Sequence, residues 1–257
     1  MACTVIQTDQ TSISVDQLVN AFEAIDRLTR ADAMMLARQT FGFYYQGLEA
    51  EEAHALKNAL ESQGVPAAIV DDADLYQLPD GKTFKRLDPT DEGLIAYDVM
   101  GRPRTVAWGN VLVVAAGYVR AIQVEKHKRT VRGGGVGLAY GGGLAMPMPS
   151  APSTEITHRG KETTRLLLEI IVNDDIGRYR ADGAELLYLY LGSDRRPRCQ
   201  DNFPRLVADL VSHASVAMLN QGAVSIVAAP DDPLIYPTRR PFEREITWLI
   251  WSGAHGS

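Results

Sequence analysis

The densest group of charged side chains in the sequence is a basic stretch near the middle of the chain. It places Lys126, Lys128, Arg129 and Arg132 within seven residues. Lysine and arginine side chains at this density attract phosphate groups, anionic lipid or acidic protein surfaces. A solvated strand end beside a loop would carry the same residues without any ligand. We therefore treat these four side chains as candidate contacts for an anionic ligand or a partner, with the solvated strand end as the alternative.

Two pairs of adjacent acidic residues stand directly after apolar segments that predict strands. Asp71 and Asp72 follow residues 67–70, and Asp174 and Asp175 follow a second apolar segment. Carboxylates at strand ends can hold a hard cation or act as a general base. Acidic residues also form ordinary turns at such positions. A small hydrolase or metal-dependent enzyme would use Asp174, Asp175 and one histidine, and turn formation is the alternative for both pairs.

The other residue types with catalytic or metal-binding chemistry do not follow a known pattern. No histidine has a partner spaced as in a zinc site; the five are His54, His127, His158, His213 and His255. The glycines of 135–141 miss the dinucleotide-binding spacing, and the sequence has no Gly-Lys-Ser or Gly-Lys-Thr of a phosphate-binding loop. No serine lies in a Gly-x-Ser-x-Gly turn. We therefore predict no catalytic residue, no metal site and no cofactor.

The overall composition is that of an acidic globular protein. The 257 residues are 46% hydrophobic and 23% charged, with a formal net charge of −6 and a pI of about 5.4. Dedicated nucleic-acid binders usually have a basic domain, so we expect no nucleic-acid partner. The longest apolar run, Val111–Ala116, is far shorter than the roughly 20 residues that span a bilayer. With no signal-peptide pattern and only two cysteines, we expect a cytoplasmic protein without a transmembrane segment.

The first 80 residues predict a small unit of helices with a strand–helix–strand segment. Residues 1–13 are polar and are expected to be loose, and Ser14 with Gln17 forms a capping-box pattern at a helix start. Apolar spacing then predicts helices near 15–25, 31–38 and 49–63 and strands at 41–45 and 67–70. The turn-rich segment 76–81 marks the expected boundary between a first domain, 1–80, and a second, 81–257.

The second domain is expected to be rich in β-strands and to contain one amphipathic helix. The expected strands are 84–87, 94–99, 104–108, 111–116, 118–125, 166–172, 186–191 and 224–228. A continuous apolar face predicts the helix at 202–214, and Ile246–Trp251 fits either a helix or a strand. Residues 132–153 hold seven glycines and three prolines, which predicts a long flexible loop.

The order of these elements resembles a bacterial pleckstrin-homology-like domain over about residues 83–215. In that superfold an antiparallel β-barrel is closed at one end by an amphipathic helix, matched here by the predicted strands and by the helix at 202–214. The segment Thr105–Val111 is similar to the polar turn that precedes an apolar strand in such domains. The unit at 41–70 is similar to half of a ferredoxin-like fold. The resemblance implies an α+β protein with a small N-terminal α/β unit, and it implies no particular activity.

The leading functional hypothesis is a non-enzymatic binding or scaffold module that engages a protein or an anionic ligand. Its contacts would be Lys126, Lys128, Arg129 and Arg132, beside the glycine-rich segment. The expected partners are a protein, a second copy of the chain or anionic lipid. One alternative is the hydrolase or metal-dependent enzyme described above. Another is a self-assembling structural protein, in which the tryptophans of Ile246–Trp251 would anchor an interface.

Overall fold

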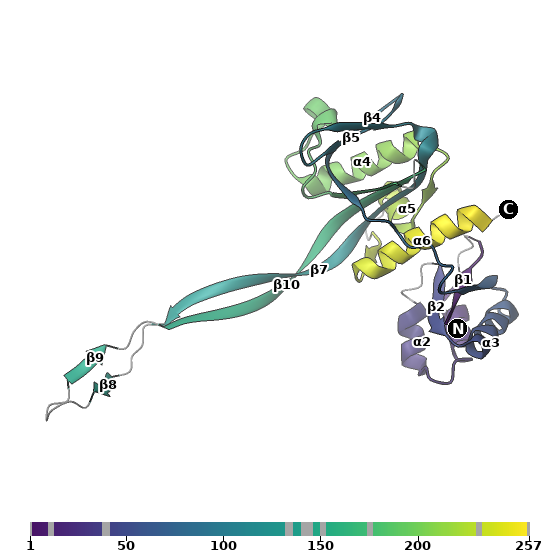
Figure 1. Cartoon of the computed structure of the whole chain (residues 1–257), viewed down its shortest axis with the longest axis horizontal. Coiled ribbons are helices and arrows are strands. Elements are labelled where there is room, and N and C mark those ends of the chain that lie inside the picture. Colours follow the sequence, from purple (N-terminus) through teal and green to yellow (C-terminus); the bar gives the residue numbers. More distant parts are fainter. Residues whose placement is uncertain are drawn as a thin grey trace. The chain divides into compact units, whose positions relative to one another are not determined.

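The computed structural model places the chain in two units (Figure 1). Unit 1 consists of Met1–Arg120 and Thr164–Ser257, and unit 2 consists of Ala121–Thr163. The structure describes the backbone of residues 2–9, 13–37, 42–131, 136–139, 146–149, 153–173, 177–229 and 233–255. Side chains are described for those of them that lie outside 123–161.

The first residues of unit 1 form the central strand of a three-stranded sheet. Strand β1 (Cys3–Gln7) pairs antiparallel with both β2 (Phe43–Leu48) and β3 (Ala67–Asp71). Every residue of β1 is buried, so the expectation that residues 1–13 are loose is wrong for this stretch. The strand is short and partly polar, and its burial depends on two partner strands that come much later in the sequence.

Three helices pack against one face of this sheet: α1 (Val15–Phe22), α2 (Arg30–Ala37) and α3 (Ala50–Ser62). The helices predicted for this region are therefore confirmed. The capping box is also present, because the Ser14 hydroxyl accepts a hydrogen bond from the Gln17 backbone N–H. The apolar stripes of the three helices and the buried side chains of the sheet form one core.

A larger sheet contains the remaining long strands. Its members are β4 (Lys82–Thr90), β5 (Gly93–Asp98), β6 (Pro103–Val106), β7 (Val111–Val131), β10 (Ser153–Val172), β11 (Gly177–Asp182), β12 (Met218–Leu219) and β13 (Ile235–Tyr236). They follow the order β12-β7-β10-β11-β4-β5-β6, and β13 also pairs with β7. A short 3₁₀ helix, η1 (Trp108–Asn110), precedes β7.

This sheet is mixed and open, whereas a closed antiparallel barrel was expected. Strands β12 and β13 run parallel to β7, and β11 runs parallel to β4. The two parallel pairs with β7 arise because crossover connections through helices bring the chain back alongside this strand. Among the described residues, no pairing joins β12 at one end of the sheet to β6 at the other. The coarser expectation of an α+β protein is confirmed.

The amphipathic helix α4 (Cys199–His213) confirms the helix expected at 202–214. Its buried face includes Phe203, Leu206 and Leu210, which lie in one core with side chains of β4, β5, β7, β10 and β11. The periodic apolar pattern was sufficient to identify this helix because every buried position recurs at helical spacing.

Residues 186–191 do not form the expected strand. They lead into a 3₁₀ helix, η2 (Leu189–Asp194), although Leu186 and Tyr188 are buried in the alternating manner of a strand. The backbone N–H of Leu187 donates to the carbonyl of Lys85 at 2.8 Å. The segment thus has the burial pattern of a strand without a regular strand ladder.

Residues 224–228 belong to helix α5 (Gln221–Ala228) and not to a strand. The helix begins after Asn220, whose side chain accepts a hydrogen bond from the backbone N–H of Ala223 at 2.9 Å. This N-cap and the packing of Ile226 in the core outweigh the preference of β-branched residues for strands.

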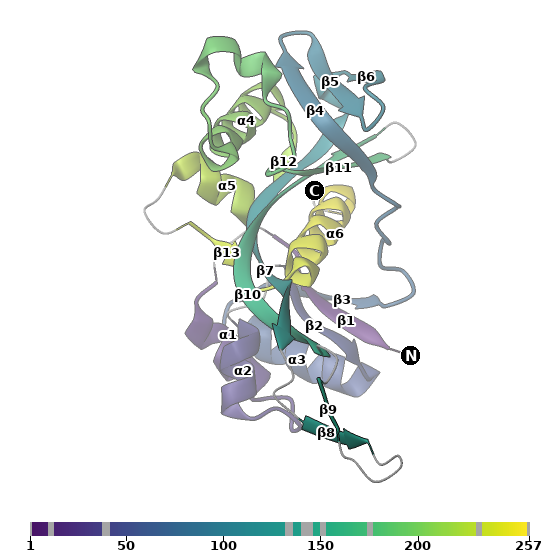
Figure 2. The same cartoon turned by 90° about the vertical axis from the view of Figure 1, so that its left-hand side faces the viewer.

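Helix α6 (Arg239–His255) settles the ambiguous segment Ile246–Trp251 as a helix. It lies between the two sheets and shares a core with Ile6 and Phe43 of the small sheet and with side chains of β7 and β10 (Figure 2). The Trp248 indole N–H donates to the Gln7 carbonyl at 2.7 Å. These contacts hold the last helix against the first strand of the chain.

Unit 2 contains the outer parts of β7 and β10 and a short antiparallel hairpin of β8 (Val136–Ala139) and β9 (Met146–Pro149). Figures 1 and 2 both show β7 and β10 side by side along this unit. Part of the segment 132–153, which was expected to be a loop, therefore forms paired strands. The rest of 132–153 lies outside the described residues.

Candidate functional site

Helix α6 carries an apolar face and a polar face because its sequence has both residue types at helical spacing. Phe242 and Ile246 are buried in the core between the two sheets. Arg240, Arg244 and Thr247 recur with the same periodicity on the opposite face and line a common cleft. The burial of the apolar face thus fixes the direction in which the two arginines point.

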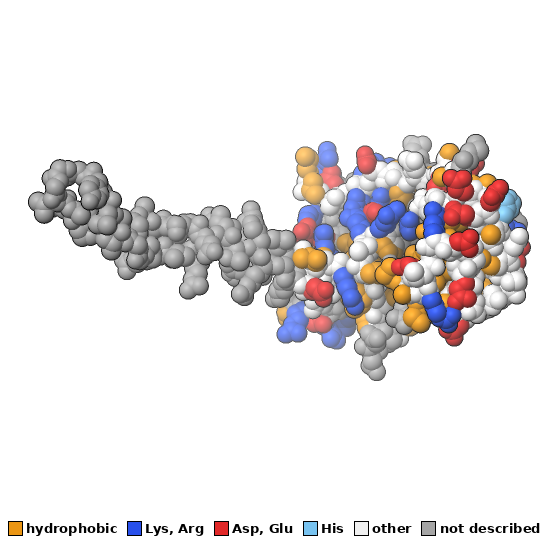
Figure 3. Space-filling model, turned by 90° about the horizontal axis from the view of Figure 1, so that it is seen from below, with side chains coloured by type: hydrophobic (Ala, Val, Ile, Leu, Met, Phe, Trp, Pro, Cys, Tyr) orange, Lys and Arg blue, Asp and Glu red, His pale blue; other side chains and the backbone are white. Residues whose placement is uncertain are grey.

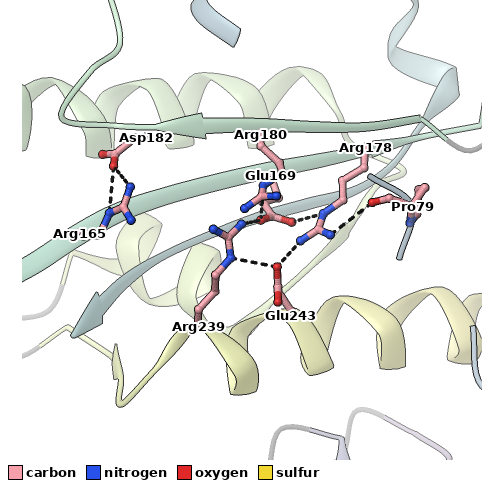
Figure 4. Close-up of polar contacts among 8 residues, drawn as sticks. All are labelled: Pro79, Arg165, Glu169, Arg178, Arg180, Asp182, Arg239 and Glu243. Carbon is pink, nitrogen blue, oxygen red and sulfur yellow. Dashed lines mark hydrogen bonds and ion pairs between the residues drawn. The ribbon is translucent and has the colours of Figure 1, made fainter. Parts of the chain in front are cut away.

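A buried ion-pair network lies beside the first turns of α6 (Figure 4). Glu169 on β10 is only 1% exposed, and it accepts from Arg178 Nε at 2.7 Å and from Arg239 Nη2 at 2.8 Å. Glu243 accepts from the same two arginines at 2.5 and 2.9 Å. Arg180 Nε lies 3.4 Å from Glu169. The network gives Glu243 two cationic partners and leaves its carboxylate neutralised.

The network also keeps Arg178 charged inside the protein. Burial by itself would lower the pKa of Arg178, but the hydrogen bonds and charges of Glu169 and Glu243 outweigh it and raise the pKa above its ordinary value. A buried ion pair of this kind needs nearly all of its hydrogen-bonding groups satisfied. The third guanidinium nitrogen of Arg178, Nη1, donates to the carbonyl of Pro79 at 3.4 Å, which adds a further partner (Figure 4).

A cleft with a volume of about 350 Å³ opens next to this network. Helix α6 contributes Arg240, Arg244 and Thr247, and β2 contributes Gln46. The segment after β3 contributes Asp72, Tyr76 and apolar side chains. The size and the mixture of apolar and polar walls are typical of a site for a small molecule.

The two arginines of the cleft lack a carboxylate partner among the described residues. Arg244 Nη2 donates to the neutral side chain of Gln46 at 2.7 Å. Burial and the neighbouring charge of Arg240 lower the pKa of Arg244. The two acids of the cleft are engaged elsewhere, Glu243 in the network and Asp72 with the Thr4 hydroxyl at 2.5 Å. The cleft therefore presents two guanidinium groups that form no ion pair with any described residue.

The distribution of charge over the surface is uneven. Figure 3 shows a face on which lysine and arginine side chains gather near the centre, while aspartate and glutamate side chains gather toward the right of the view. Clustering of one sign of charge raises the local concentration of ligands of the opposite sign.

A second buried polar network joins α5 to α6. The Tyr236 hydroxyl donates to Glu245 Oε2 at 2.5 Å and accepts from Asn220 Nδ2 at 2.9 Å. Glu245 Oε1 accepts from the Gln221 backbone N–H at 2.7 Å. Burial raises the pKa of Glu245 to about 7, against the opposing effect of these hydrogen bonds. Every polar atom named here has a protein partner, so we assign this network a structural role.

The described residues that line the cleft do not include the basic residues singled out in the sequence. Lys126, Lys128 and Arg129 lie on the outer part of β7, in unit 2, where only the backbone is described. Arg132 lies outside the described residues, as do Asp174 and Asp175. The predicted contact role of the four basic residues stays a prediction.

In the first acid pair, Asp71 has the contact expected of a turn residue. The Asp71 carboxylate accepts a hydrogen bond from the backbone N–H of Ala73 at 3.0 Å. Among the histidines with described side chains, His213 stacks on Trp108 and His255 stacks on Trp251. Within the described part of the chain, no three His, Cys, Asp or Glu residues are grouped so that they could hold a metal ion.

Sequence reasoning missed the cleft because its walls come from distant segments. Arg244 and Gln46 are 198 residues apart. The spacing of Arg240 and Arg244 on a helix was a usable signal, but the segment was not assigned as a helix. Only the structure brings Gln46 and Asp72 to these arginines.

The chain matches no known protein family model, no curated protein and no solved structure. In the described residues, no helix combines the length and apolar character needed to cross a bilayer.

Proposed function

We propose that this protein is a non-enzymatic binding module that holds a small anion in the cleft beside α6. One observation carries the proposal. The half-buried guanidinium of Arg244 has a neutral partner, lies beside the positive charge of Arg240, and makes no ion pair within the described residues. A bound anion would offset the cost of keeping two like charges close together in a partly desolvated site.

The chemistry of the lining residues defines the class of ligand. Two guanidinium groups favour a carboxylate or a phosphate, because arginine can donate two parallel hydrogen bonds to either group. The Thr247 hydroxyl and the Gln46 amide can add neutral hydrogen bonds. Asp72 is an acceptor at the same cleft and suits a ligand that also carries a hydroxyl or an amine. We therefore expect a small organic anion with at least one hydrogen-bond donor.

The lining supports binding over catalysis. Histidine, cysteine and lysine are the groups that most often exchange protons or attack substrates near neutral pH. None of the described residues that line the cleft is of these three types. Burial raises the pKa of Tyr76 above its ordinary value, so this phenol stays protonated and is a poor base.

A thermal-shift measurement tests the proposal with inorganic phosphate and, separately, with citrate. At about ten times the dissociation constant, a ligand of the folded state adds about 1.4 kcal/mol. For a chain of this size the unfolding midpoint should then rise by roughly 3–6 °C. Arg244→Gln should abolish most of the rise, because it removes the half-buried positive charge and leaves a neutral polar amide in its place.

Arg205→Gln is the matched control. Arg205 also donates to a neutral partner, the Asp194 carbonyl at 2.8 Å, but it lies on α4 and does not line the cleft. The control should keep the full shift. An equal shift in wild type and Arg244→Gln would contradict the proposed site. A rise of the unfolding midpoint with phosphate but not with citrate would indicate a phosphate ligand. A rise with citrate but not with phosphate would indicate a carboxylate ligand.

The pleckstrin-homology-like resemblance stays a prediction, and the proposed function does not depend on it. Packing of the amphipathic helix α4 on the larger sheet supports the resemblance. The open, mixed sheet weighs against it.

A further inference from the structure

Unit 2 is a two-stranded ribbon along most of its length. Strand β7 pairs with β12 at Val113 and Val114 and with β13 at Tyr118 and Val119, all before unit 2 begins. Strand β10 pairs with β11 at residues 167–172, after unit 2 has ended. Within the described part of unit 2, β7 and β10 therefore have no third strand beside them. An isolated two-stranded ribbon is marginally stable in water, so a binding partner would stabilise it.

The ribbon is basic although the chain as a whole is acidic. Between residues 121 and 163 the sequence has six lysines and arginines against three acids, whereas the whole chain has 26 against 32. Lys126, Lys128 and Arg129 lie on β7, and Arg159 and Lys161 lie on β10. Basic residues from both strands are thus placed in one narrow element.

The repulsion expected from the acidic remainder of the chain acts over a short range. The screening length at physiological ionic strength is about 8 Å. Beyond this length, the net negative charge of the chain repels an anionic surface only weakly.

The end of unit 2, residues 133–154, differs in composition from its shaft, which consists of the parts of β7 and β10 that belong to unit 2. The sequence has no Asp, Glu, Lys or Arg from residue 133 to residue 154. Within this stretch β8 and β9 pair, with Gly137 opposite Met148 and Leu138 opposite Pro147. A ribbon that enters a nucleic-acid groove needs positive charge where it meets the phosphates, including its end. An uncharged end on a basic shaft is instead the pattern of an element that enters the interfacial layer of a membrane.

We propose that unit 2 docks on an anionic lipid bilayer, with the basic residues of β7 and β10 at the headgroups and the β8–β9 hairpin in the interfacial layer. This inference is independent of the cleft beside α6. Each basic residue near an anionic surface strengthens binding by about fivefold, and the attraction weakens as salt rises.

Sedimentation with vesicles tests the inference on the full chain. The vesicles are phosphatidylcholine alone or phosphatidylcholine mixed with phosphatidylserine, at low and at raised salt. We expect binding to the mixed vesicles, with affinity falling as salt rises. Replacing Lys126, Lys128 and Arg129 together by Gln should weaken binding by about a hundredfold. The matched control replaces the exposed Arg195, Arg196 and Arg198 by Gln, an equal change of charge, and should bind like wild type.

A second variant tests the hairpin. Leu138→Asp should weaken vesicle binding while leaving its dependence on salt unchanged, because it removes apolar insertion and keeps the basic shaft. The inference would be overturned if wild type did not bind the mixed vesicles, or bound both compositions equally. It would also be overturned by equal losses in the two triple variants, or by tighter binding to duplex DNA than to the vesicles. The salt series on wild type does not depend on the folding of any variant.

Discussion

Glu245 links the stability of the protein to pH at the scale of a single residue. Its carboxyl group is buried and its pKa is raised from 4.5 to about 7. Between these two values the unfolded chain has released the proton while the folded protein still holds it. The free energy of unfolding should therefore fall as pH rises from about 4.5 to about 7, by about 3 kcal/mol from this group.

Urea unfolding at a series of pH values checks this prediction. Glu245→Gln has no proton to lose at this position, so its stability should not show this part of the decline. Glu92→Gln, at an exposed position, should follow the wild-type curve. If Glu245→Gln declined as steeply as wild type between these pH values, the assignment of the linkage to Glu245 would be wrong.

Only part of the candidate site could be predicted at this scale. The basic stretch around Lys126 is visible because its members are consecutive in the sequence. The cleft depends on Arg244, Gln46 and Asp72, which come from three segments. Taken singly, an arginine, a glutamine and an aspartate do not indicate a binding site in the sequence. That Arg244 forms no ion pair within the described residues, which carries the proposed function, is a property of the folded arrangement alone.

At the scale of elements, α4 provides the clearest test of packing. Leu210 is fully buried on the apolar face of this helix. Leu210→Ala should lower the free energy of unfolding by about 2–5 kcal/mol, because it removes buried apolar surface and leaves a cavity. Ser212→Ala, at an exposed position of the same helix, should change it by about 0.5 kcal/mol or less.

Chemical denaturation of the two variants measures this difference, and equal losses would mean that α4 is not docked through Leu210. Asp209, although on the polar side, is unsuitable as the control. Its carboxylate accepts from the Tyr190 hydroxyl at 2.7 Å, and its removal would leave that half-buried hydroxyl without this partner.

Elements with a long periodic pattern could be predicted from the sequence, and elements defined by distant partners could not. Helices α3 and α4 were identified by apolar positions at helical spacing. Strand β1 was missed because its burial comes from β2 and β3. Helix α5 was taken for a strand because its β-branched residues masked the capping signal of Asn220.

At the scale of the whole molecule, the last helix joins parts of the chain that the sequence separates. The described residues form three hydrophobic cores, and the third combines Ile6 and Phe43 of the small sheet with α6 and the larger sheet. The boundary predicted near residue 80 stays a prediction. The cleft has walls from β2, from the segment after β3 and from α6, so it exists only when α6 is packed against the small sheet.

The central claim is that the two arginines of this cleft bind an anion, and the side-chain NMR signal of Arg244 tests it most directly. In the full chain labelled with ¹⁵N, the Nε–Hε signal missing from the Arg244→Gln spectrum identifies Arg244. Titration with phosphate or citrate should move this signal saturably, while the Arg205 signal, identified in the same way, should stay in place. Movement of Arg205 without Arg244, or no movement of the Arg244 signal with either anion, would contradict the claim.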